Sequence, residues 1–264
     1  KTWENLINKI HNLQKEVTIA VVGKYTNLKD SYKSIIEALI HRGIENNVKV
    51  KIEWINAEKI ETDQLINELK NVDGILIPGG FGYRGVEGKI QAIKFAREND
   101  IPFFGICLGM QLSVIEIARN LIGKQDSNST EFKTSNNPVV SLMTEWNNEN
   151  KTEKRDLTSD KGGTMRLGAY RAILKKGSRI HNIYNSDEIS ERHRHRYEVD
   201  LSYTRDFEKK GFHFSGMSPD NILPEVIESV NHKWFIGVQF HPELKSRPLA
   251  PHPLFSSFIK HCIK

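Results

Sequence analysis

Cysteine is scarce in this chain, which carries only Cys107 and Cys262 among its 264 residues. Two cysteines cannot form the disulfide framework of a small secreted domain, and they suit a reducing compartment. No apolar run approaches the roughly 20 residues that a membrane span requires, and the start lacks a signal-peptide pattern. We therefore expect a cytoplasmic protein with no membrane partner. Because the chain begins with Lys1 and not with Met, we also expect it to be a piece of a longer protein.

A strong excess of charge of one sign is also lacking. The 38 lysines and arginines are interspersed with 33 acids, so the net charge is only +5, with a pI near 9.0. Such a mixture indicates a solvated surface and no nucleic-acid partner. Hydrophobic residues make up 38% of the chain, which is enough for the core of an α/β domain.

The first third of the chain alternates between buried strands and amphipathic helices. We expect strands at 17–22, 48–55 and 72–77, and helices at 30–46 and 58–69. This βαβαβ order predicts a parallel sheet covered by helices on both faces, with ligands beyond the carboxyl ends of the strands. An apolar stripe at helical spacing near the start predicts a linker or docking helix. We therefore divide the chain into that segment, residues 1–16, and one domain, residues 17–264.

Cys107 lies where a buried strand, 101–106, turns abruptly into a helix. Gly105 and Gly109 lie two residues before and after it. This is the spacing of the G-x-S-x-G nucleophile elbow, with a cysteine sulfur in place of the serine oxygen. A helix N-terminus beside a thiol favours the thiolate, the form that attacks carbonyls. The alternative is a small buried hydrophobic residue, which is how most free cysteines behave. The two glycines favour the interpretation of Cys107 as a nucleophile over that of a buried hydrophobic residue.

A glycine-rich loop, Pro78–Gly82, follows the third strand. Residues 80–85 formally match the G-x-G-x-x-G pattern of dinucleotide-binding proteins. That site belongs in the first strand-to-helix turn, with an acidic residue at the end of the next strand, and the next strand here ends in Gly105-Ile-Cys107 instead. A plain tight turn is another alternative. We favour an oxyanion-binding role for the backbone N–H groups of the loop and of Leu108.

Two polar stretches follow the elbow helix. Residues 145–162 are almost wholly polar, which predicts a mobile excursion. Residues 191–198 read Glu-Arg-His-Arg-His-Arg-Tyr-Glu, and an extended backbone would separate the arginines from the histidines. A metal pair at His193 and His195 lacks further ligands, and a solvated basic strand is a second alternative. The third is an arginine that binds a substrate carboxylate.

The last clear strand, 234–240, ends in His241-Pro242-Glu243. Proline fixes the backbone between the two polar residues, so the carboxylate could hold the tautomer and orientation of the imidazole. A single histidine at a strand end is usually structural. Together with the Cys107 elbow, however, the pair predicts a Cys-His-Glu catalytic triad.

These motifs resemble those of the class I, or triad, glutamine amidotransferases, and more narrowly those of the C-terminal glutaminase domain of the CTP synthase family. The blocks that carry the resemblance span nearly the whole chain. They are Gly23-Lys-Tyr25, Pro78–Gly85, Gly105–Gln111, Asn128–Phe132, Gly163–Gly168, Glu191–Glu198 and Gln239–Glu243. One departure is the segment before Gly163, which is longer and more charged than expected of the family.

The resemblance implies a three-layer αβα domain with a central, mostly parallel sheet, the flavodoxin-like fold of class I glutamine amidotransferases. It implies that Cys107 attacks the side-chain amide of L-glutamine, that His241 transfers protons and that Glu243 orients His241. It also implies that backbone N–H groups near Gly80 and Leu108 bind the oxyanion. The residues implied to surround glutamine are Gly80, Leu108, Gly109, Met110, Gln111, Glu131 and Arg196. No metal is implied.

The resemblance also implies partners outside this chain. Ammonia would travel to an N-terminal synthetase domain of the same polypeptide, which uses ATP, UTP and Mg²⁺, with GTP as activator, in a homo-oligomer, a tetramer. The glutaminase domain itself would need no cofactor. Two other functions stay open at this point, a nucleotide-binding module built on the 80–85 loop and a catalytically silent regulatory or interaction domain.

Overall fold

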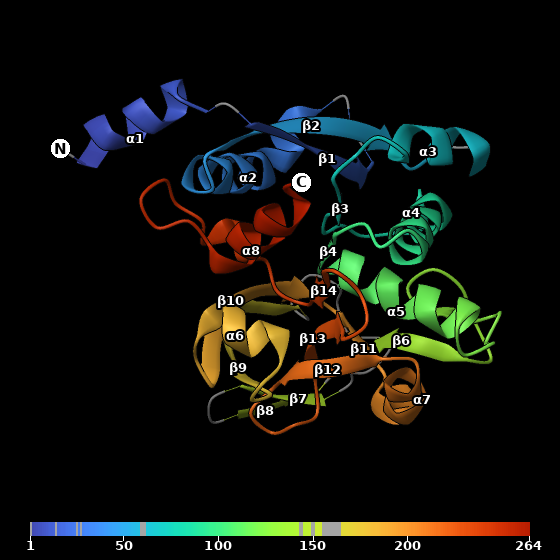
Figure 1. Ribbon diagram of the computed structural model, residues 1–264. Coiled ribbons are helices and arrows are strands. Elements are labelled where there is room, and N and C mark those ends of the chain that lie inside the picture. Colours follow the sequence, from blue (N-terminus) through green and yellow to red (C-terminus); the bar gives the residue numbers. More distant parts are fainter. Residues whose placement is uncertain are drawn as a thin grey trace.

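The computed structural model describes residues 2–13, 15–24, 26, 28–58, 62–142, 145–148, 151–154 and 165–264 (Figure 1). A sheet of nine strands runs through the molecule in the order β10-β9-β12-β13-β14-β4-β3-β1-β2. Five neighbouring strands, which form one half of it, run parallel. They are β2 (Val48–Asn56), β1 (Lys15–Gly23), β3 (Gly74–Ile77), β4 (Phe103–Ile106) and β14 (Phe235–Val238).

The other half of the sheet is antiparallel. It contains β13 (Pro224–Ser229), β12 (Phe212–Met217), β9 (Arg166–Leu174) and β10 (Glu188–His195). A small second sheet joins β11 (Tyr197–Val199), β6 (Pro138–Leu142) and β5 (Asn128–Ser129). The predicted βαβαβ order is correct, and the parallel arrangement holds for the half of the sheet that carries Cys107.

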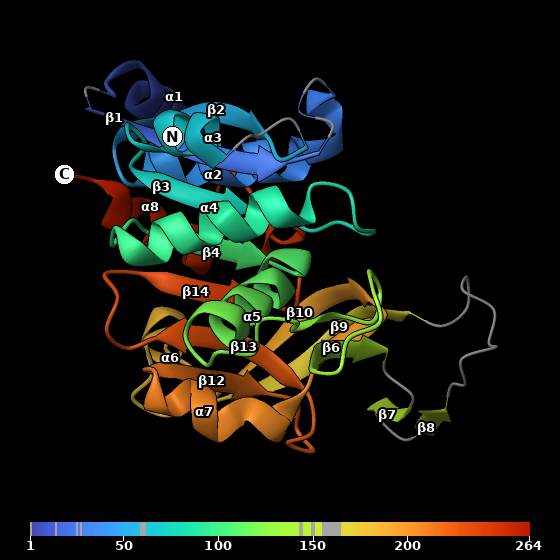
Figure 2. The same ribbon diagram turned by 90° about the vertical axis from the view of Figure 1, so that its right-hand side faces the viewer.

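Helices cover both faces of the sheet, so the predicted three-layer fold is confirmed. In Figure 2, α4 and α5 lie in front of the strands and α8 lies behind them. One face carries α3 (Thr62–Leu69), α4 (Val86–Glu98), α5 (Leu108–Asn120) and α7 (Thr204–Lys209). The other carries α2 (Lys33–Glu45), α6 (Arg179–Tyr184) and α8 (Pro253–Cys262). Short 3-10 turns form at η1 (Lys29–Tyr32), η2 (Leu201–Tyr203) and η3 (Pro242–Leu244).

The N-terminal helix, α1 (Thr2–His11), forms within the segment that we assigned to a linker. Trp3, Ile7 and Ile10 on its apolar stripe are all largely exposed, so these side chains are not buried against the domain. The limit between linker and domain stays a prediction. None of the helices in the described ranges is long and apolar enough to cross a membrane.

Part of the polar stretch 145–162 forms two strands, whereas we expected a mobile loop. Strands β7 (Glu145–Asn148) and β8 (Lys151–Lys154) pair antiparallel as a hairpin. The remainder of the stretch, 149–150 and 155–162, lies outside the described residues.

The close approach of α5 to the strands explains the two glycines around Cys107. A methyl group on Gly109 would lie 2.3 Å from the carbonyl oxygen of Ile77, and one on Gly105 would lie 2.7 Å from the carbonyl carbon of Gly109. No neighbouring atom in these contacts is the end of a flexible side chain. Only glycine therefore lets the helix begin directly beside β3 and β4.

This contact predicts the effect of Gly109→Ala on stability. Alanine in place of glycine ordinarily stabilises a helix by about 0.5–1 kcal/mol. Here we expect the free energy of unfolding to fall by roughly 1–3 kcal/mol, because the methyl group overlaps main-chain atoms of β3. Denaturant unfolding followed by circular dichroism measures the change. A variant as stable as the parent chain, or more stable, would contradict the packing described here.

Candidate active site

Three neighbouring parallel strands bring the predicted site together. Strands β3, β4 and β14 lie side by side, and the chain leaves them through the glycine loop, Cys107 and His241, respectively. Since parallel strands end at one edge of a sheet, these three segments meet there. The backbone N–H of Cys107 donates to the carbonyl oxygen of Val238 at 2.7 Å, which ties the elbow to the strand that carries His241.

Cys107 adopts a backbone conformation that residues other than glycine rarely adopt. Its φ is 51° and its ψ is −101°, and α5 begins at the next residue. The side chain is 2% exposed. Its Sγ lies 3.7 Å from Nε2 of Gln239 and 4.0 Å from the carbonyl oxygen of Arg194. The sulfur thus lies at a helix N-terminus between two polar groups, an environment typical of a reactive thiol.

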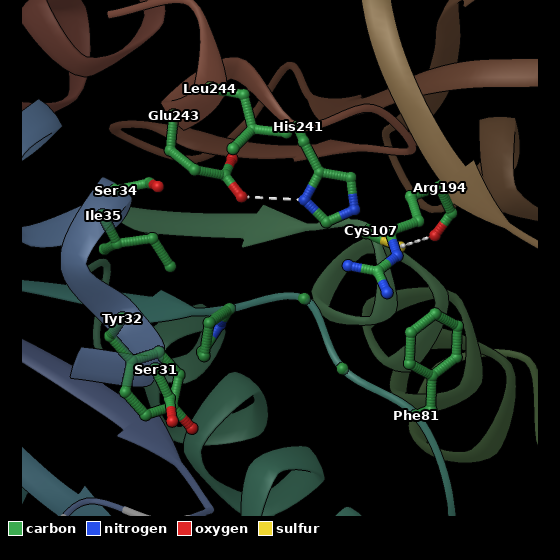
Figure 3. A pocket seen from close by; sticks show the side chains of 13 residues that line it. Ser31, Tyr32, Ser34, Ile35, Phe81, Cys107, Arg194, His241, Glu243 and Leu244 are labelled. Carbon is green, nitrogen blue, oxygen red and sulfur yellow. Dashed lines mark hydrogen bonds and ion pairs between the residues drawn. The ribbon is translucent and has the colours of Figure 1, made fainter. Parts of the chain in front are cut away.

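The imidazole of His241 lies between Glu243 and Cys107 (Figure 3). Nδ1 is 2.7 Å from Oε1 of Glu243, while Nε2 is buried and makes no hydrogen bond within the part of the chain that the structure describes. Burial lowers the pKa of His241, but the Cys107 sulfur and the Glu243 carboxylate outweigh it and raise this pKa to about 10. At neutral pH the ring is therefore protonated and can donate from Nε2.

A pocket of ≈ 260 Å³ opens over these three side chains (Figure 3). Its walls come from the η1–α2 segment, the glycine loop, strand β10 and the turn η3. Besides Cys107, His241 and Glu243, the lining residues are Ser31, Tyr32, Ser34, Ile35, Pro78, Gly79, Gly80, Phe81, Arg194 and Leu244. A small polar molecule can therefore reach the sulfur and the imidazole together.

The glycine loop packs directly against the imidazole. A methyl group on Gly79 would lie 2.7 Å from Cε1 of His241 and 3.5 Å from Cβ of Cys107. Further along the loop, the Gly82 N–H donates to Oε1 of Glu131 at 2.7 Å. Lys24 Nζ donates to the carbonyl oxygen of Phe81. The loop is thus held on both sides, with Gly79 and Gly80 at the pocket.

The predicted glutamine-binding residues fall into two groups. Gly80 lines the pocket, and Leu108, Gly109, Met110 and Gln111 form the buried first turn of α5 directly after Cys107. Within that turn, Nε2 of Gln111 donates to the carbonyl oxygen of Tyr197 at 2.9 Å and to Oε1 of Gln239 at 3.1 Å. The Gln111 side chain therefore connects the first turn of α5 to Tyr197 and Gln239.

Glu131 and Arg196 form the second group, and neither is among the residues that line this pocket. Burial raises the pKa of Glu131, whereas the Gly82 N–H and the charges of Lys24, Arg196 and Lys89 act in the opposite direction. Glu131 thus supports the glycine loop, with Arg196 close enough to act on its charge.

Sequence reasoning missed Arg194 and Gln239, which both contact the Cys107 sulfur. Arg194 belongs to the alternating stretch from which only Arg196 was selected. Gln239 stands two residues before His241, and the sequence motif Gln239–Glu243 indicates no role for it. Arg192 and Arg194 do lie on the exposed face of β10, as the alternation predicted, and Arg196 lies just beyond its end. The alternation of side chains carried no signal for the backbone carbonyl of Arg194.

The alternative metal pair at His193 and His195 finds no support. Within the described ranges no three histidine, cysteine, aspartate or glutamate side chains are grouped as metal ligands. His193 is instead bound to Glu225, with Nε2 2.6 Å from Oε2, and Nδ1 of His195 is 3.3 Å from Oε1 of Glu198.

A family model for the class-I glutamine amidotransferases matches residues 27–261, and the chain belongs to this family. Among its relatives it is similar to the CTP synthase of Brucella anthropi, with 60% identity over 262 residues, which cover 99% of this chain and 48% of that protein. The CTP synthase of Rhizobium etli strain CFN 42 is 61% identical over 258 residues, which cover 98% of this chain and 48% of that protein. The chain thus spans about half the length of the curated relatives it matches.

Solved structures agree with this assignment. The glutaminase domain of a Trypanosoma brucei CTPS with bound acivicin is 38% identical, with a TM-score of 0.83 and 93% of each chain covered. A putative GMP synthase component from Thermoplasma acidophilum has a TM-score of 0.55 at 16% identity, covering 94% of this chain and 95% of that one. The second likeness shows the fold alone.

The position of Cys107 predicts a change in the titration of His241. In Cys107→Ala the negative charge that attracts the proton is lost, while burial and Glu243 remain, so we expect the pKa of His241 to fall clearly below about 10. The ring would then lose its proton at a lower pH than in the parent chain. NMR titration of the imidazole measures the shift, with Cys262→Ala as the control. An unchanged pKa in Cys107→Ala would show that the two side chains do not interact.

Proposed function

We propose that this chain hydrolyses L-glutamine to glutamate and ammonia through Cys107, His241 and Glu243. The observation that carries the proposal is that Cys107, His241 and Glu243 meet at one pocket, with Nδ1 of His241 2.7 Å from Oε1 of Glu243. The adjacent Cys107 sulfur and the Glu243 carboxylate raise the pKa of His241. This is the arrangement of an activated cysteine nucleophile with an oriented acid–base partner. Membership of the class I glutamine amidotransferases and likeness to a glutaminase domain agree with it.

In the first half of the reaction the Cys107 sulfur attacks the side-chain amide carbon of glutamine. The C=O electron pair moves to the oxygen, and the resulting tetrahedral oxyanion collapses to a thioester. The amide nitrogen leaves as ammonia after it takes the proton from Nε2 of His241. Glu243 keeps the imidazole oriented and stabilises its charge before the transfer.

In the second half a water molecule takes the place of ammonia. Neutral His241 accepts a proton from the water at Nε2 while the oxygen attacks the thioester carbon. The second tetrahedral intermediate expels the Cys107 thiolate, glutamate leaves, and the protonated imidazole is restored. One glutamine and one water thus give one glutamate and one ammonia.

Backbone groups supply the oxyanion site in this proposal. The first N–H groups of a helix have no partner within it, so the Leu108 N–H at the start of α5 is available beside Cys107. Gly80 lines the same pocket. We assign glutamine contacts to these two residues, to Gly109, Met110 and Gln111 of the same turn, and to Glu131 and Arg196. The last two would act at the amino and carboxylate groups of glutamine.

The two alternative functions are less compatible with the site. A nucleotide phosphate on the 80–85 loop would need the backbone N–H groups that the loop presents, and the Gly82 N–H already donates to the carboxylate of Glu131. That carboxylate would also repel a phosphate. A silent interaction domain would have no use for a strained cysteine beside a histidine with a raised pKa.

For the longer protein we propose CTP synthesis, the activity that the names of its relatives print. Ammonia would pass to a synthetase part of the same polypeptide that uses ATP, UTP and Mg²⁺, with GTP as activator, in a tetramer. The glutaminase part needs no cofactor of its own, because the reaction above uses only side chains, backbone and water.

Variants of the triad test the proposed chemistry. Cys107→Ala and His241→Ala should each lower kcat for glutamine hydrolysis by roughly 10³-fold or more, whereas Glu243→Gln should lose less. Triad members act as a unit, and the orienting member matters least. Ammonia release from glutamine is the assay, and Cys262→Ala, in a buried thiol away from the pocket, should remain as active as the parent chain. Normal turnover by His241→Ala would refute the mechanism.

A second experiment tests whether glutamine hydrolysis and CTP synthesis belong to different parts of the longer protein. Supplied with ATP, UTP and glutamine, this chain alone should make no CTP, because its sequence lacks a G-x-x-x-x-G-K-[ST] phosphate loop. Adding a separately produced synthetase part with nucleotides should raise the rate of glutamine hydrolysis, if the partner completes the oxyanion site. CTP made by the chain alone would overturn the proposal, as would a glutaminase rate that the partner never alters.

A further inference from the structure

Strand β10 supports the proposed triad through its backbone. It is an edge strand of the nine-stranded sheet and pairs with β9 on one side. On the other side the carbonyl oxygen of Arg192 accepts from the backbone N–H of His241 at 2.7 Å, and that of Arg194 lies 4.0 Å from Sγ of Cys107. The open edge of the strand thus contacts both Cys107 and His241. The position of β10 therefore affects the positions of these two residues.

The buried face of β10 is unusually polar. Alternate side chains of the strand point inward, and this set includes Glu191, His193 and His195. His193 is fully buried, with Nδ1 3.0 Å from the carbonyl oxygen of Glu191 and Nε2 2.6 Å from Oε2 of Glu225. Both ring nitrogens therefore lie beside oxygen atoms that can accept a hydrogen bond. A buried polar side chain of this kind is costly unless such partners satisfy it.

Glu225 links His193 to the site from a different strand. It lies in β13, which β9 and β12 separate from β10 in the sheet, so the contact joins strands that are not neighbours. The buried guanidinium of Arg166 binds the other carboxylate oxygen at 2.6 Å. Burial raises the pKa of Glu225, but the charges of His193 and Arg166 outweigh it and keep this carboxyl ionised.

The same two residues also contact the segment that carries the triad. The carbonyl oxygen of Glu225 accepts from the backbone N–H of Gln239 at 2.9 Å, and Gln239 contacts the Cys107 sulfur. The ring of His193 packs edge-on against Phe240, with centroids 5.9 Å apart, directly before His241. The buried pair therefore touches Gln239 and Phe240, the two residues that directly precede His241.

A second buried group holds the middle of β10. Oε1 of Glu191 accepts from the hydroxyl of Tyr184 and lies 3.0 Å from Nε2 of His252. Lys245 Nζ contacts the same carboxylate at 3.2 Å and donates to the carbonyl oxygen of Ser190 at 2.6 Å. With the middle of the strand held in this way, His193 and Glu225 act on the end of the strand that lies nearest Cys107.

We propose that His193 and Glu225 are a positioning pair, which holds β10 so that the Arg192 carbonyl fixes the backbone of His241 and the Arg194 carbonyl faces the Cys107 sulfur. The pair touches neither substrate nor the reacting atoms and acts through the strand. The inference rests on the proposed glutaminase function and adds two residues to it. A displacement of about 1 Å at a reacting group can cost on the order of 10²-fold in rate.

Two conservative substitutions separate the contacts of His193. In His193→Gln the side-chain amide nitrogen can take the place of Nε2 and donate to Glu225, whereas in His193→Asn it can take the place of Nδ1 but not reach Glu225. We expect His193→Gln to keep kcat/KM for glutamine within a few-fold of the parent chain and His193→Asn to lose about 10- to 100-fold. Both substitutions are polar, so neither forces an apolar group beside Glu225.

A readout without glutamine distinguishes failure of this inference from failure of the proposed function. The rate of alkylation of Cys107 by iodoacetamide, followed from acidic to alkaline pH, reports the interaction of Cys107 with His241. We expect the pH profile of His193→Asn to move toward that of an isolated thiol and that of His193→Gln to stay near the parent profile. If the parent chain lacked glutaminase activity but the profiles still differed in this way, the positioning pair would stand and the proposed function would fail.

The control is His232→Asn, at a second buried histidine with both ring nitrogens bonded. Its Nε2 is 3.1 Å from the carbonyl oxygen of Ala96, and its Nδ1 accepts from the backbone N–H of Trp234, at the far end of β14. We expect this variant to lose stability without a change in the alkylation profile. Equal kcat/KM and profiles in His193→Asn and the parent chain would overturn the inference. An equal profile change in His232→Asn would overturn it as well.

Discussion

The site depends on the abrupt turn at Cys107. A non-glycine residue at φ 51° and ψ −101° is strained and persists only where its surroundings enforce it. Here the enforcement comes from the hydrogen bond of the Cys107 N–H to Val238 and from the packing of α5 on β3, which Gly109 permits. Strand, elbow and helix are thus a single unit, and the position of the sulfur follows from the sheet.

The electrostatics of the site follow from that geometry. Burial alone would make His241 a weaker base, yet the neighbouring sulfur and Glu243 reverse the effect and raise its pKa to about 10. The result is a proton held on Nε2, next to the place where an amide nitrogen would leave. At Cys262, by contrast, burial and the charge of Asp73 raise the pKa of the thiol well above the usual range.

Local sequence patterns were sufficient for much of the fold and of the site. The alternation of strands and helices predicted the parallel half of the sheet, and the glycines around Cys107 and the His241-Pro242-Glu243 motif pointed to the pocket. The contributions of Arg194, Gln239 and Glu225 could not be predicted, because they depend on how the antiparallel half of the sheet brings β10 against the segment that follows β14. A sequence pattern defines which face of β10 is buried but not which distant carboxylate meets His193. The apolar stripe of α1 has the same limit, since a stripe indicates burial without naming the partner, and its linker or docking role stays a prediction.

The central claim is that Cys107 forms a covalent thioester with glutamine while His241 supplies the proton. Rapid acid quenching of the chain with L-glutamine, followed by peptide mapping with mass spectrometry, tests it directly. A glutamyl adduct should appear on the peptide that contains Cys107 during turnover and decay when glutamine is exhausted. Glutamine hydrolysis without any adduct on Cys107, or with the adduct on Cys262, would contradict the account.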